Sequence, residues 1–106
     1  MYCHGPQITE LPPNLNNLET LVCKWTSITK LPPNLNKLKT LDCSEAPITE
    51  LPTNLINLHI LNCAYTPITK LPPNLNNLKE LDCKWTRIEE LLHLIYFQSN
   101  KIRKIN

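Results

Sequence analysis

Apolar and polar positions follow a pattern that repeats every twenty residues along this chain. Written from Leu18, the frame is L-x-x-L-x-C-x-x-T-x-I-x-x-L-P-x-N-L-x-x, and it begins again at Leu38, Leu58 and Leu78. Self-similarity at a fixed period of roughly 20–50 residues is the signature of a repeat architecture. The period therefore predicts the fold before any single residue is considered.

Each repeat is expected to contain one short strand and an extended return. Leu21 and Cys23 lie two positions apart, which is the spacing of neighbours on one face of a strand. The "LPPNL" half is not helix interior, because paired prolines remove backbone donors and fix φ, so we expect extended or polyproline II backbone. No such coil can bury its Leu and Ile alone, so neighbouring coils should stack and their strands form a parallel sheet.

At these residues the chain resembles the leucine-rich repeat family, whose signature is L-x-x-L-x-L-x-x-N-x-L. The resemblance covers Ile8 to Leu91 at least. The short unit with "LPPNL" is similar to repeats of bacterial type III effectors of the YopM and IpaH kind, and the Cys and "T-x-I-T" wording are similar to uncharacterised repeat proteins of amoeba-infecting giant viruses. The resemblance implies a leucine-rich repeat solenoid with a parallel sheet on its concave face, an extended convex side and little helix.

The chain departs from the family pattern at two positions. Cys replaces the third Leu, and the family's Asn position holds Thr26, Ala46, Thr66 and Thr86. An Asn there would join neighbouring coils by hydrogen bonds, a role that we expect Thr to fill in part and Ala46 not at all. The single Gly also leaves Asn to adopt the positive φ that tight turns require.

The pattern divides the chain into a solenoid over residues 1–91 and a C-terminal cap over residues 92–106. The first coil lacks its opening L-x-x-L, so its core side chains should be open to solvent beside Met1 and Tyr2. Repeat arrays normally need polar caps, so either the chain is a fragment of a longer protein or this end meets a partner, a second copy being the simplest.

The cap itself has two interpretations. Ile88, Leu91, Leu92 and Ile95 have helical spacing, which favours a short helix. A second repeat frame is also matched, with the family's own Asn at Asn100, by Leu92, Ile95, Phe97, Asn100, Ile102 and Ile105. That frame would need a coil of only fourteen residues from Leu78 to Leu92, so we expect a final irregular coil or a short helix that acts as a cap.

Composition narrows the classes of partner. Five Cys occur on one line of the repeat, where each is expected to be a small buried hydrophobe instead of a metal ligand or disulfide, since no C-x-x-C pair exists. Buried thiols favour a reducing compartment, so we expect a cytoplasmic protein, with a host-cell cytoplasm included. A formal net charge of +2 predicts neither nucleic acid nor membrane as partner, and we expect no cofactor.

The strand surface is the candidate binding site, because the resemblance places contacts at the x positions of the strand. Trp and Tyr dominate interface hot spots, although these rings could equally serve only to cover the strand ends. The expected binding residues are Trp25, Tyr65, Trp85, Lys24, Lys84, Asp42, Asn62 and Asp82.

A row of alternating charge marks the thirteenth position of the coils. Glu10, Lys30, Glu50, Lys70 and Glu90 give each coil a neighbour of opposite sign, whereas a slip of one coil would place like charges together. We interpret this row as a device that fixes the register of stacking, since exposed ion pairs contribute only ~0.2–1 kcal/mol each.

Catalysis is not expected, because His4, His59 and His93 are isolated from other recurrent acids or nucleophiles. Asp42 and Asp82 share a row two coils apart, but nothing in the sequence closes a pocket over them. Two hypotheses remain: a non-catalytic module that binds a protein through its concave face, or a structural unit that self-associates through its uncapped N-terminal end.

Overall fold

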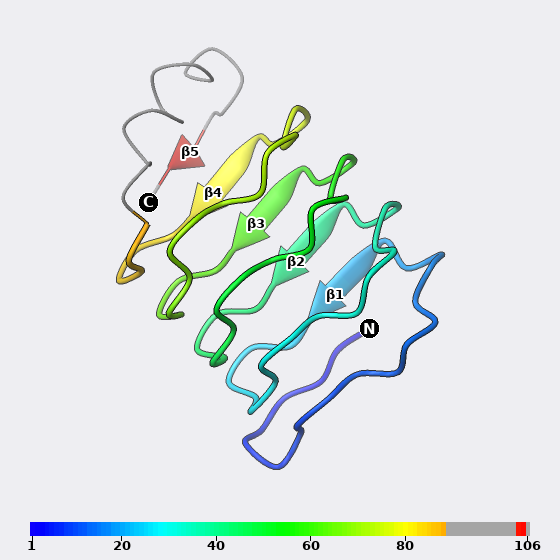
Figure 1. Ribbon diagram of the computed structural model, residues 1–106, viewed down its shortest axis with the longest axis vertical. Coiled ribbons are helices and arrows are strands. Elements are labelled where there is room, and N and C mark those ends of the chain that lie inside the picture. The colour runs from blue at the N-terminus through cyan, green and yellow to red at the C-terminus, as the bar shows by residue number, and fades with distance from the viewer. Residues whose placement is uncertain (89–103, 106) are drawn as a thin grey trace.

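The computed structural model describes residues 1–88 and 104–105. The strands are β1 (Thr20–Val22), β2 (Thr40–Asp42), β3 (Ile60–Asn62), β4 (Glu80–Asp82) and β5 (Lys104–Ile105), paired in chain order. Figure 1 shows the strands side by side, and from β1 to β4 each coil returns to the start of the next strand. The first four begin twenty residues apart, and all pairings are parallel. The predicted parallel sheet of regularly spaced strands is confirmed, in an arrangement consistent with a repeat solenoid.

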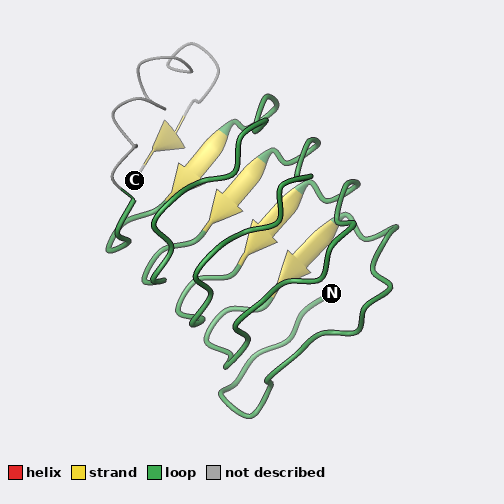
Figure 2. Cartoon of the chain, viewed as in Figure 1, coloured by secondary structure: helices red, strands yellow, loops and turns green. Residues whose placement is uncertain are grey.

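The described part of the chain contains no helix (Figure 2). The proline-rich returns follow irregular backbone, closed by a turn in which Leu38 N–H donates to Leu35 O at 3.1 Å, with its equivalents in the other coils. Asn34 and Asn74 have φ of 67° and 68°, so the expectation that Asn adopts positive φ is confirmed at these two positions.

The sheet is in register, and this register builds the core. Leu21 pairs with Leu41, Leu41 with Leu61, and Leu61 with Leu81, and all four side chains are buried. The Cys after each strand and the Ile of each return pack into the same cluster. The sequence frame therefore predicted the inward positions correctly, because a period of two in each strand is combined with identical spacing between strands.

Neighbouring coils are joined at a position other than the one that the family pattern suggested. Thr26 Oγ1 donates to Cys23 O of its own coil at 2.9 Å, as its equivalents do, so these Thr close their own turns and the expectation that they join coils is wrong. Side chains at the twentieth position link the coils instead. Asn57 Nδ2 donates to Asn36 O at 2.6 Å, and Asn77 Nδ2 donates to Ile56 O at 2.8 Å.

Both ends of the sheet carry additional pairing. Tyr2 forms a parallel bridge with Val22, and Cys3 N–H donates to Val22 O at 2.8 Å, so the N-terminal residues continue the sheet beyond β1. At the other end, Ile105 of β5 pairs with Leu81. The edge of β4 is thus occupied by Lys104–Ile105. Residues 89–103, on which the expected helix stripe and the second repeat frame mostly fall, lie outside the described residues, and the C-terminal cap stays a prediction.

The thirteenth-position charges are exposed but not in contact. Within residues 1–88, the row of Glu10, Lys30, Glu50 and Lys70 forms no ion pair, and Glu90 lies outside the described residues. The described ion pairs are Lys39–Glu19 at 3.0 Å and Lys84–Asp82 at 3.7 Å. The role of the row in fixing register stays a prediction, and any such effect acts at longer range than direct pairing.

Candidate functional site

The eighth position of the repeat, two residues after the Cys that follows each strand, has left-handed backbone conformation. The φ values are 55° at Trp25, 59° at Glu45, 57° at Tyr65 and 59° at Trp85. We call these four residues the eighth-position row. A left-handed conformation costs an L-residue about 1–2 kcal/mol, and it is normally occupied by Gly, Asn or Asp. The sequence analysis did not detect this feature, because a bulky side chain gives no sign of positive φ.

Backbone hydrogen bonds hold the row in place. Trp25 N–H donates to Ser44 O at 2.9 Å, and Glu45 N–H donates to Ala64 O at 3.0 Å. Tyr65 N–H makes the equivalent bond to Lys84 O, also at 3.0 Å. The pairing between coils thus continues past the three-residue strands, and it gives successive members of the row the same orientation.

Two pairs of rings lie along this row. Tyr65 and Trp85 stack with centroids 6.3 Å apart and an interplanar angle of 21°. His4 and Trp25 lie 5.1 Å apart and are tilted by 52°. Trp25, Tyr65 and Trp85 are 49%, 51% and 75% exposed. Glu45 occupies the coil between the two pairs, so the structure adds His4 and Glu45 to the residues expected from the sequence.

The seventh position provides a mixed border beside the row. Ser44 and Ala64 are buried, whereas Lys24 and Lys84 are exposed in the outer coils. Lys84 pairs with Asp82 of its own coil. The two exposed cations therefore lie beside Trp25 and Trp85, three coils apart. The two coils between them carry the small, buried and uncharged Ser44 and Ala64 at this position.

The fifth-position residues have a structural role as well as a place on the sheet surface. Asp42 Oδ1 accepts hydrogen bonds from Ser44 N at 3.0 Å and Ser44 Oγ at 2.6 Å. Asn62 Oδ1 accepts from Ala64 N at 3.1 Å, and Asp82 Oδ1 from Lys84 N at 3.3 Å. Each side chain thus satisfies the backbone two residues later, in the manner of an Asx turn. These three residues orient the turn that carries the eighth-position row.

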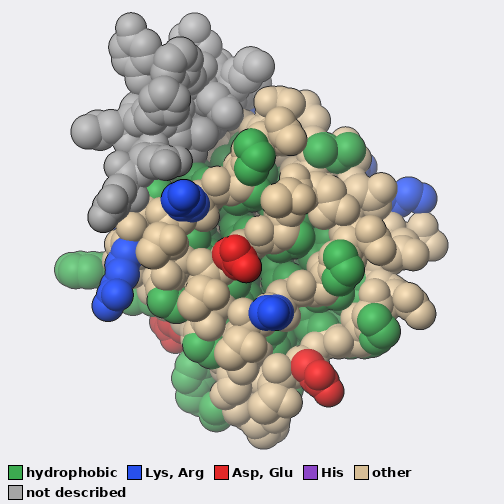
Figure 3. Space-filling view, viewed as in Figure 1, with side chains coloured by type: hydrophobic (Ala, Val, Ile, Leu, Met, Phe, Trp, Pro, Cys, Tyr) green, Lys and Arg blue, Asp and Glu red, His purple; other side chains and the backbone are tan. Residues whose placement is uncertain are grey.

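Figure 3 shows one broad face of the molecule, on which charged side chains of both signs stand singly among polar and apolar ones. Of the eight expected site residues, Asp42, Asn62 and Asp82 lie in β2, β3 and β4, and the other five lie in the turns that follow the strands. The aromatic ones fall into two clusters, Trp25 with His4 and Tyr65 with Trp85. No concentrated field of one sign is visible on the face shown.

The thiols lie under this surface and belong to the core. Burial is the first cause that raises the pKa of Cys23 and of Cys63 to about 12, and the neighbouring Cys of the column contributes second. The pKa of Cys43 is also raised well above its ordinary value, first by burial and then by the neighbouring Cys63 and Cys23. A thiol that stays protonated at neutral pH is a poor nucleophile and metal ligand. Among the described residues, no three His, Cys, Asp or Glu side chains are grouped closely enough to hold a metal ion.

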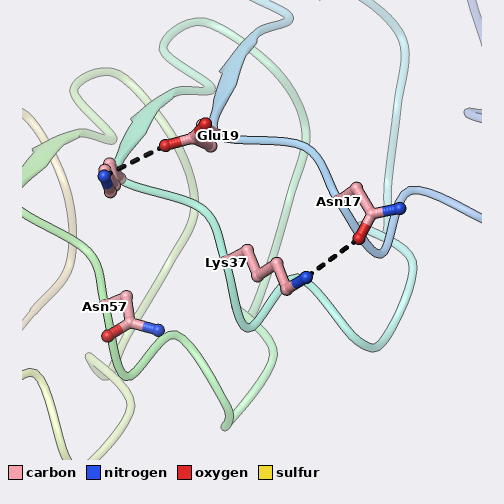
Figure 4. Close-up of a pocket in the computed structure, with 5 residues that line it drawn as sticks. Asn17, Glu19, Lys37 and Asn57 are labelled. Atoms are coloured by element: carbon pink, nitrogen blue, oxygen red, sulfur yellow. Dashed lines mark hydrogen bonds and ion pairs between the residues drawn. The ribbon is translucent and has the colours of Figure 1, made fainter.

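A polar hollow of about 470 Å³ is lined by residues that precede the strands, whereas the eighth-position row follows the strands. Figure 4 shows Asn17, Glu19, Lys37 and Asn57 around it. Lys37 Nζ donates to Asn17 Oδ1 at 3.0 Å, and Glu19 pairs with Lys39. Each charged group of the hollow already has a partner in a neighbouring coil, so the hollow joins coils and is the weaker candidate for a ligand site.

Comparison with known proteins returned no relative: no family model, no curated protein and no solved structure matches the chain. Among the described residues there is also no helix with the length and apolar character needed to cross a bilayer.

Proposed function

We propose that this chain is a leucine-rich-repeat module that binds a protein without catalysis. The proposed binding surface is the solvent-exposed, concave face of its sheet together with the eighth-position row. The observation that carries the proposal is the set of exposed rings of Trp25, Tyr65 and Trp85 on left-handed backbone. Gly or Asn would satisfy that backbone at lower cost, so large side chains there are best explained by a function that needs them. Rigid aromatic side chains are the commonest anchors of protein interfaces.

The surrounding chemistry fits a protein partner better than a nucleic acid or a membrane. The net charge is only +2, and Lys24 and Lys84 are offset nearby by Asp42, Glu45 and Asp82. A phosphate-binding surface would need a concentrated basic patch. We propose a reducing compartment such as the cytoplasm, that of a host cell included, because the buried thiols are suited to it.

The test is a quantitative capture experiment with the double variant Trp25→Ala and Trp85→Ala. Proteins that the immobilised wild-type chain retains from a host-cell lysate are identified by mass spectrometry. The affinity of each for the chain is then measured with purified components. We expect the double variant to weaken binding of the true partner by at least tenfold, since hot-spot aromatics each contribute about 2 kcal/mol or more.

Ile56→Ala is the matched control, because Ile56 is a similarly exposed apolar residue (45%) outside the row. A partner that binds the double variant and the wild-type chain equally would show that the eighth-position row is not the interface.

Self-association through the N-terminal end is the second candidate function, and one observation favours it. Core positions of the first coil are only partly buried, whereas their equivalents in inner coils, such as Ile28 and Leu35, are fully buried. The apolar residues concerned are Cys3, Ile8, Leu11, Leu15 and Leu18. Stacking a second copy on this end would bury them, as coils bury one another within the chain.

A further inference from the structure

We propose that the gap in the eighth-position row at Glu45 is a subsite for one cationic side chain of the protein partner, a guanidinium or an ammonium group. The inference rests on the proposed protein-binding function and specifies the chemistry of its central contact. It depends on three features: the two ring pairs, the carboxylate between them and the absence of a cation against that carboxylate.

The ring pairs define the walls of the subsite. Tyr65 stacks on Trp85 in the adjacent coil, and Trp25 packs with His4 on the side away from Glu45. Strands in a sheet are ~4.8 Å apart, so the backbones of Trp25 and Tyr65, on either side of the Glu45 coil, are ~9.6 Å apart. A planar group sandwiched between two rings needs ~3.5–4 Å on each face. The gap thus accommodates one flat group or one aliphatic stem.

The carboxylate of Glu45 supplies the charge. Glu45 is exposed, and no hydrogen bond or ion pair to its side chain occurs among residues 1–88. The seventh-position neighbours Ser44 and Ala64 carry no charge. A cation between aromatic faces is attracted by the ring quadrupoles, and a nearby carboxylate adds to that attraction.

Other charges near the row leave Glu45 available. Lys84 lies two coils away and is engaged by Asp82 at 3.7 Å. Lys24 lies one coil away on the border of the row, and Asp42, in the same coil as Glu45, adds a second negative charge. At its fifth, seventh and eighth positions, the Glu45 coil therefore carries two acidic residues, Asp42 and Glu45, and no basic one.

Backbone conformation supports the choice of Glu45 for this role. Its φ of 59° is unfavourable for Glu, and the row would keep its geometry with Asn or Gly there. A short Asn side chain would also leave the gap open, but without charge. The acidic group is the property that the alternatives lack.

The test is an NMR titration with N-acetyl-arginine amide, and with the neutral isostere N-acetyl-citrulline amide as the matched ligand. The indole N–H resonances of Trp25 and Trp85 report on the row directly. We expect saturable shifts of the Trp25 indole with the arginine compound in the millimolar range, and at least threefold weaker binding of the citrulline compound. Glu45→Gln should weaken arginine binding at least threefold, whereas Glu50→Gln, which removes an exposed carboxylate from the same coil, should leave it unchanged.

Equal binding of the arginine and citrulline compounds, equal binding to the wild-type chain and Glu45→Gln, or no saturable shift at all would overturn the subsite. The same variants in the capture experiment separate this inference from the proposed function. If Trp25→Ala with Trp85→Ala loses the partner while Glu45→Gln retains it at full affinity, the row is the interface but Glu45 is not a cation site. If both changes leave the partner bound, the proposed interface itself is wrong.

Discussion

At the scale of single residues, the unusual feature is that a Trp, a Glu, a Tyr and a second Trp all occupy left-handed backbone, at positions 25, 45, 65 and 85. Trp25, Glu45 and Tyr65 are each fixed by a backbone hydrogen bond to the next coil, such as the bond from Glu45 N–H to Ala64 O. The surrounding coils thus impose a conformation that the residues themselves disfavour. We infer that their side chains are kept for what they contact outside the chain.

Replacing Glu45 by Gly should make this cost measurable. Gly adopts positive φ without a steric penalty, which stabilises the folded state. Gly also makes the unfolded chain more flexible, and this offsets about 0.5–1 kcal/mol of that stabilisation. Ala keeps the penalty, so we expect the free energy of unfolding of Glu45→Gly to exceed that of Glu45→Ala by up to about 1 kcal/mol in urea denaturation. A Gly variant less stable than the Ala variant would show that the row is not strained.

At the scale of elements, short strands are supplemented by side chains that satisfy the backbone around them. Fifth-position Asp and Asn close the turn after the strand, and twentieth-position Asn57 and Asn77 reach to the preceding coil. The family pattern placed that linking role at the ninth position, where Thr instead bonds within its own coil. A three-residue strand has few ladder bonds, so these side-chain bonds supply part of the order between coils.

The cysteine column predicts a loss of stability at alkaline pH. The pKa of Cys23 and of Cys63 is raised to about 12 in the folded state from the ordinary value of 9.0. Between these values the unfolded chain loses thiol protons that the folded chain retains, so the free energy of unfolding decreases as pH rises above 9.0 towards 12. The slope should approach about 1.4 kcal/mol per pH unit for each such thiol.

Urea denaturation at several pH values from 8 to about 11 measures this slope. Cys63→Ala is the matched control: it removes one thiol and should reduce the slope, although it also lowers stability at every pH. The same slope in the wild-type chain and the variant would contradict a role for the buried thiols and would assign the pH dependence to other groups.

At the scale of the whole molecule, the stacking of coils leaves the N-terminal coil different from the coils in the middle. Met1 and Tyr2 pair with β1 through the backbone, with the Met1 amino group donating to Thr20 O at 2.7 Å. The pairing extends the sheet but covers little of the side chains below it, and Ile8, Leu11 and Leu15 stay partly exposed. An apolar end of this kind is a surface on which a second copy can stack.

If the second candidate function holds, light scattering should show a mass that is a multiple of the 12.2 kDa chain. Ile8→Asp should return the species to a monomer, because it places a charge on the apolar end. Ile56→Asp, a similar change at an exposed site away from that end, should leave the mass unchanged. A wild-type chain that is monomeric at high concentration would remove the support for self-association. Circular dichroism of each variant checks that it remains folded.

The sequence by itself determined the parallel sheet, its twenty-residue spacing and the inward positions, such as Leu41 and Cys43, because a strict repeat imposes the same buried face on every coil. It also indicated Trp25, Tyr65 and Trp85 as surface residues. Only the tertiary structure decided that Trp25 pairs with His4 and Tyr65 with Trp85, with Glu45 in the coil between the two pairs. It also decided that the eighth-position backbone is left-handed and that Ile105 pairs with Leu81. These features depend on hydrogen bonds and packing between coils, which no local propensity encodes.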